Sequence, residues 1–105
     1  MLFRSALFET YFGLRRAPEM PQTDSMSFAH DDNEALISVF RVKDASYPKI
    51  FHIGFLQNSK AQVDEIHEKL RLGGFEPGEP ATEHGRFVFY VSAPGGFVIE
   101  VSAQV

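Results

Sequence analysis

The chain has 105 residues, of which 44% are hydrophobic, and its formal net charge is −4. This length suits one globular domain with a modest core, and the hydrophobic content excludes a disordered chain. Because Lys and Arg are not clustered, the charge argues against a nucleic-acid partner. No apolar run approaches the ~20 residues that span a bilayer, which argues against a membrane protein. The absence of cysteine excludes disulfides and thiolate ligands, and it is typical of a cytoplasmic protein.

The first 42 residues predict one helix followed by three strands. Apolar side chains recur at helical spacing over residues 3–12, and Gly13 is a typical helix stop. Residues 14–20 suit a short strand. Residues 24–30 and 34–42 flank an Asp-Asp-Asn segment that favours a turn, so we expect them to form an antiparallel hairpin.

The second half predicts a strand, a helix and three further strands. The helix begins after Ser59, a typical N-cap, and Gln62 stands where a capping box places its partner. Gly73 and Gly74 end this helix. The expected strands cover residues 50–56, 75–78, 86–92 and 97–102, with a loop from 79 to 85. The element order of the first half is the same except for the opening strand, which suggests two copies of one unit.

Two polar residues stand inside the apolar strands of this second half, His52 and Glu100. The period-two alternation of a strand separates each of them from the large apolar side chains next to it. A buried charge is costly unless it is paired or bound to a metal, and imidazole and carboxylate both bind divalent metals. The pair is therefore a candidate metal site, although a strand histidine can also have no ligand role.

Four segments carry a family resemblance: residues 7–14 (LFETYFGL), 52–55 (HIGF), 63–75 (VDEIHEKLRLGGF) and 89–100 (FYVSAPGGFVIE). Together with the element order, they resemble the vicinal oxygen chelate superfamily of glyoxalases, fosfomycin and bleomycin resistance proteins and extradiol dioxygenases. The resemblance implies an α+β fold of paired βαβββ modules within a single domain, residues 1–105. Residues 1–42 would be a first module that lacks its opening strand, and residues 50–105 a complete second module.

The resemblance also implies that His52 and Glu100 are metal ligands, for Zn, Ni, Mn or Fe. Two protein ligands are fewer than the three that are usual in a catalytic zinc site. The opening strand, which often carries another ligand in the family, is missing here, and the usual Asp of the closing turn is replaced by Ala93. His30 could replace the missing ligand, or it could be an exposed residue beside a turn.

Three further residues are candidates for substrate binding: Tyr90, Arg86 and His84. Tyr90 occupies a position that faces the substrate in several relatives, but it could equally be a core or rim aromatic residue. Arg86 and His84 precede Tyr90 along the chain and could bind an anionic group, or they could form a solvated junction between loop and strand. We expect His67, on the helix, to be structural or exposed.

Three classes of function remain open from the sequence. The first is a metal-dependent lyase, isomerase or dioxygenase acting on a small, oxygen-rich molecule. The second is a metal-free small-molecule binding protein similar to the bleomycin resistance proteins, and the third is a degenerate interaction subunit. The resemblance implies a homodimer. The sequence identifies neither the substrate nor a general base.

Overall fold

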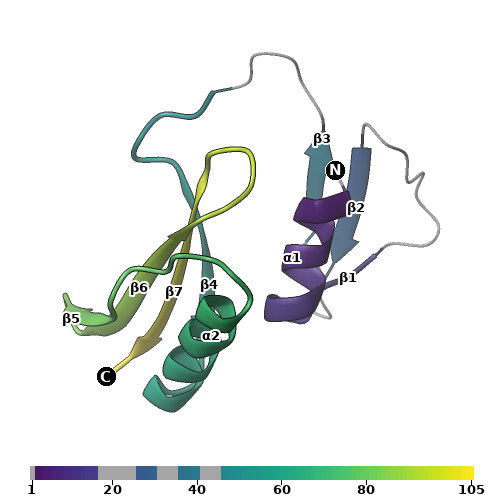
Figure 1. Ribbon diagram of the computed structural model, residues 1–105. Coiled ribbons are helices and arrows are strands. Elements are labelled where there is room, and N and C mark those ends of the chain that lie inside the picture. Colours follow the sequence, from purple (N-terminus) through teal and green to yellow (C-terminus); the bar gives the residue numbers. More distant parts are fainter. Residues whose placement is uncertain (1, 17–25, 31–35, 41–45) are drawn as a thin grey trace. The chain divides into compact units, whose positions relative to one another are not determined.

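In the computed structural model, the described residues are 2–16, 26–30, 36–40 and 46–105. The chain divides into two compact units, Met1–Ala45 and Ser46–Val105 (Figure 1). Both combine helix and strand, so the fold is α+β, as predicted. Within the described segments, neither helix is long and apolar enough to cross a membrane.

The first unit contains helix α1 (Leu2–Phe12) and the strands β1 (Arg15–Arg16), β2 (Met26–His30) and β3 (Leu36–Phe40). The strands pair antiparallel in the order β1-β2-β3. Gly13 ends the helix with a φ of 70°, a backbone conformation that glycine adopts without steric penalty. The predicted helix and hairpin are thus confirmed. The predicted turn, and most of the predicted strand 14–20, lie outside the described residues.

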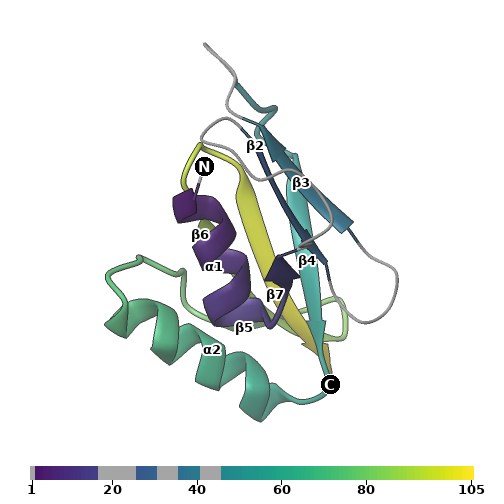
Figure 2. The ribbon, with the colours of Figure 1, turned by 90° about the vertical axis from the view of Figure 1, so that its right-hand side faces the viewer.

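The second unit contains β4 (His52–Gln57), α2 (Lys60–Leu72), β5 (Ala81–Glu83), β6 (Arg86–Ser92) and β7 (Val98–Gln104). Its sheet has the order β4-β7-β6-β5. The edge strand β4 runs parallel to its neighbour β7 (Figure 2). The other two pairs, β7/β6 and β6/β5, are antiparallel. This confirms the predicted order of strand, helix and three strands.

Helix α2 has a specific cap at each end. The Ser59 hydroxyl accepts a hydrogen bond from the Gln62 amide at 3.2 Å. The Gln62 side chain does not complete the predicted capping box, because it accepts from the Asn58 amide at 2.8 Å instead. At the other end, Phe75 N–H donates to Leu70 O and Gly74 N–H to Arg71 O, the two bonds of a Schellman motif. Gly74 supplies the positive φ of 92° that this motif requires.

The core of the second unit lies between α2 and one face of the sheet. Val63 and Leu70 of the helix are fully buried, as are Ile99 and Val101 of β7. Burying a side chain of this size contributes about 1.5–3 kcal/mol. His67 packs edge-on against the Phe89 ring at 5.1 Å and hydrogen-bonds the Gly78 carbonyl at 3.0 Å, so its role is structural, as expected.

The sequence reading was wrong about the segment that follows α2. Residues 75–80, which include the predicted strand 75–78, form no strand, and β5 lies inside the predicted loop. The reason is that Pro77 and Pro80 lack the N–H groups that a ladder needs. In this segment, Gly78 N–H donates to Tyr90 O of β6 at 2.8 Å. Regular pairing starts only after the second proline.

Candidate functional site

The register of β4 and β7 brings His52 and Glu100 to the same face of the sheet. His52 aligns with Val98, and Gly54 aligns with Glu100. Aligned residues of paired strands project to the same side, and so do residues two apart on one strand. We call this side the polar face, defined by His52, Gly54, Tyr90 and Glu100; α2 packs on the opposite side.

Gly54 leaves room for the Glu100 carboxylate. A Cβ atom built on Gly54 would lie 3.3 Å from Glu100 Oε2, closer than most such contacts in proteins. The carboxylate therefore extends over the backbone of β4, the strand that carries His52. A larger residue at position 54 would occupy that space.

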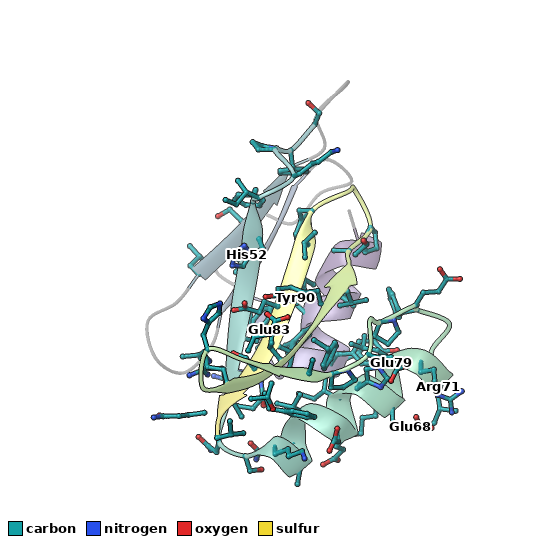
Figure 3. The ribbon with its side chains drawn as sticks, turned by 90° about the vertical axis from the view of Figure 1, so that its left-hand side faces the viewer. His52, Glu68, Arg71, Glu79, Glu83 and Tyr90 are labelled. Atoms are coloured by element: carbon teal, nitrogen blue, oxygen red, sulfur yellow. The ribbon has the colours of Figure 1, made fainter. Side chains whose placement is uncertain are left out.

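The His52 ring has a defined hydrogen bond. Its Nδ1 lies 2.9 Å from the Ile50 carbonyl oxygen. Because a carbonyl can only accept, Nδ1 carries the proton, and a neutral ring then has its lone pair on Nε2. Metal-binding histidines commonly donate their other N–H to a backbone carbonyl in this way. His52 is exposed (Figure 3).

Tyr90 lies beside Glu100 on the neighbouring strand. The two residues are aligned in the β6/β7 register, and the Tyr90 hydroxyl donates to Glu100 Oε1 at 3.2 Å. Desolvation raises the pKa of the Tyr90 hydroxyl above its ordinary value. The hydrogen bond to Glu100, the negative charges of Glu100 and Glu83 and, least, a hydrogen bond to Glu83 raise this pKa further. The phenol consequently stays protonated at neutral pH and remains a donor.

Arg86 and His84 occupy different environments. Arg86 Nε donates to the hydroxyl of Ser102, a polar side chain that is only 1% exposed, at 3.1 Å. Part of the guanidinium is thus committed to a structural bond. His84 and Gly85 form the two-residue turn between β5 and β6, with positive φ values of 50° and 78°. The structure brings Tyr90 to the His52/Glu100 pair; the ligand roles predicted for Arg86 and His84 stay predictions.

Glu83 is a residue of this face that the sequence reading missed. It ends β5, aligns with Arg86, and its charge acts on Tyr90. Figure 3 shows Glu83 and Tyr90 close together on the sheet. Recognising His84-Gly85 as a two-residue hairpin turn would have revealed β5 and, by alternation, the face on which Glu83 lies.

Two of the described residues at this site, His52 and Glu100, have side chains that could hold a divalent metal. The lone pair of His52 Nε2 and the carboxylate of Glu100 suit Zn, Ni, Mn or Fe(II). Within the part of the chain that the structure describes, no cluster of three or more His, Asp or Glu side chains could hold a metal. The donor types therefore fit such an ion, and the set is incomplete.

Residues 6–101 match the model of the Glyoxalase/Bleomycin resistance protein/Dioxygenase superfamily. The chain belongs to this superfamily. This confirms the resemblance that the four sequence segments carry. No functionally curated protein matches the chain.

Several solved structures are similar to the chain. A protein of Bacillus cereus described as a possible glyoxalase is 36% identical, with a TM-score of 0.85 over 95% of this chain and 86% of that one. Two more distant structures share the fold. Fosfomycin resistance protein FosX of Listeria monocytogenes is 17% identical, with a TM-score of 0.80 over 100% and 84% of the two chains. Lactoylglutathione lyase of Agrobacterium tumefaciens is 22% identical, with a TM-score of 0.70 over 96% and 83%.

Proposed function

We propose that this protein binds a divalent metal ion through His52 and Glu100 and acts on a small molecule with two adjacent oxygen atoms, as a lyase, isomerase or oxygenase. The observation that carries the proposal is the bonding of both side chains. The Nδ1 of His52 is held by a backbone carbonyl, which leaves the lone pair of a neutral ring on Nε2, and Glu100 accepts a hydrogen bond from Tyr90. Bonds of this kind orient the ligands of established metal sites.

The metal would supply Lewis-acid polarisation of a substrate oxygen. The chain's own residues would do the rest. Tyr90 holds the carboxylate of Glu100 in one orientation, and Gly54 keeps the space between the two strands clear. Arg86 has N–H groups beyond its bond to Ser102 with which it could bind a substrate oxygen. We assign no general base.

The missing ligand and the edge of the sheet both favour a homodimer. β4 lies at one edge of its four-stranded sheet, where its outer N–H and C=O groups have no strand partner among the described residues. Such an edge is usually covered. We propose that a second copy covers it, and that residues 1–42 and 50–105 are the incomplete and the complete module of one domain.

Isothermal titration of the full chain with Ni²⁺ and Zn²⁺ tests the metal site. We expect about one equivalent per chain for the wild type, and loss of tenfold or more in affinity for His52→Ala and Glu100→Gln. His84→Ala and Glu65→Gln are matched controls, since they remove the same groups from exposed positions outside the pair. Equal affinity in all five proteins would refute the site.

The second candidate is a metal-free binding protein. It is favoured by the incomplete ligand set of the described residues. Thermal unfolding with and without a candidate ligand separates the two, because a ligand that binds only the native state raises the unfolding temperature. The metal-free candidate predicts the same shift in the presence of a chelator, whereas the metal-dependent proposal predicts that the chelator abolishes it.

A further inference from the structure

Glu83 places a second carboxylate beside Tyr90. Glu83 is the last residue of β5, and the two-residue turn that follows returns the chain to the polar face at Arg86. Figure 3 shows the labelled Glu83 and Tyr90 next to each other on this face, while Glu79, a few residues earlier, lies well apart from them. Tyr90 therefore has an acidic side chain from β5 near its hydroxyl in addition to Glu100 from β7.

The two carboxylates share one donor. A phenol has a single proton. The Tyr90 hydroxyl donates to Glu100 Oε1 at 3.2 Å, and a weaker hydrogen bond to Glu83 also raises the Tyr90 pKa, so the proton satisfies only one of the two carboxylates at a time. Glu83 therefore retains acceptor capacity that the Tyr90 hydroxyl cannot satisfy at the same time. A bound molecule that presents an N–H or O–H group at this place would satisfy it.

Among the described residues, no ion pair balances the negative charge of Glu83 and Glu100. Within the described residues, neither Glu83 nor Glu100 forms an ion pair with Lys, Arg or His, whereas Glu65 and Glu68 on α2 do. Arg86 aligns with Glu83 but directs Nε to Ser102. A metal at Glu100 would offset one charge and leave that of Glu83.

From this arrangement we infer that Glu83 is a specificity residue: it favours ligands whose chelating oxygens are accompanied by an uncharged or cationic hydrogen-bond donor, such as an amide, amine or hydroxyl. It disfavours ligands that bring a carboxylate or phosphate close to Tyr90. The inference rests on the proposed metal site, which it extends by naming the class of ligand.

Two small probes test the charge preference on the nickel-loaded full chain. Glycolate and glycolamide share one carbon frame with adjacent oxygens, and they differ in carrying a carboxylate or a neutral amide. We measure the affinity of each by competition calorimetry for the wild type and for Glu83→Gln. The ratio of glycolate to glycolamide affinity should rise about threefold to tenfold in Glu83→Gln, because one nearby negative charge is removed.

Glu79→Gln is the matched control, since it removes the same charge from an exposed position away from Tyr90, and its ratio should equal that of the wild type. An unchanged ratio in Glu83→Gln, an equal change in Glu79→Gln, or no binding of either probe by nickel-loaded protein would overturn the inference while leaving the metal site in place. Wild-type protein that takes up no nickel would instead refute the proposed function, and the inference would fall with it.

Discussion

The two faces of the second unit's sheet differ in what their residues do. The face against α2 carries Phe89, Ile99 and Val101, all at most 1% exposed. The polar face carries Tyr90 and Glu100 at alternating positions of the same two strands, and their polar atoms bond each other. Stability is concentrated on the first face and binding groups on the second, so substitutions on the two faces should have separable effects.

The largest expected effect is on the helix-facing side. Ile99→Ala should lower the free energy of unfolding by about 2–5 kcal/mol, because it removes a fully buried side chain and leaves a cavity beside α2. Urea unfolding monitored by circular dichroism measures this. Glu100→Gln, the next residue on the same strand, should change stability by less than about 1 kcal/mol. Comparable losses for both would refute the division of roles.

The second largest expected effect is the loss of metal affinity in Tyr90→Phe. The change removes the hydroxyl that orients Glu100 while retaining the ring, so divalent-metal affinity should fall about tenfold to a hundredfold with little loss of stability. Calorimetric titration with Zn²⁺ checks this. Tyr47→Phe is the control, because the Tyr47 ring packs on Phe51 rather than on the polar face. Unaltered affinity in Tyr90→Phe would mean that the hydrogen bond does not position the ligand.

Gly54→Ala should have a smaller effect of the same kind. The new methyl group would lie 3.3 Å from Glu100 Oε2, and the flexible carboxylate would have to move away. We expect metal affinity to fall about threefold to tenfold, as for a displaced but intact ligand. Zinc titration measures the affinity. Gly78→Ala is the control, because a methyl group there would make an ordinary 3.4 Å contact with a backbone carbonyl and none with Glu100. An affinity equal to that of the wild type would show that the space above Gly54 is not needed.

The smallest effect concerns α2. The hydrogen bond and positive charge of Arg71 lower the pKa of Glu68. This ion pair favours the folded state above the unfolded pKa of Glu68, and that contribution is lost as the pH falls through the lower folded value. Because both groups are exposed, the contribution is small. Arg71→Gln should raise the Glu68 pKa toward its ordinary value, which carbon-detected NMR titration measures, with no change in metal affinity. A Glu68 pKa that is the same in Arg71→Gln and in the wild type would contradict the role given to Arg71.

The alternation of polar and apolar residues along the strands allowed much of the polar face to be predicted. The apolar residues around His52 and Glu100 set the face of each strand, and the family segments supplied the pairing of those strands. The contacts that distinguish this chain could not be read in the same way. The Ile50 carbonyl bond to His52 depends on where β4 begins, two residues later than expected. The position of Glu83 on this face was not predicted, because the two prolines that precede β5 are typical of a loop.

The most direct test of the central claim is the state of the four histidine rings. Nitrogen-15 NMR of histidine-labelled protein resolves Nδ1 and Nε2 of each ring, with His52→Ala assigning the signal. On addition of one equivalent of Zn²⁺, we predict a shift of His52 Nε2 to a metal-bound value, an Nδ1 that stays protonated, and no change at His67 or His84. Binding through Nδ1, or zinc uptake without any change at His52, would contradict the account.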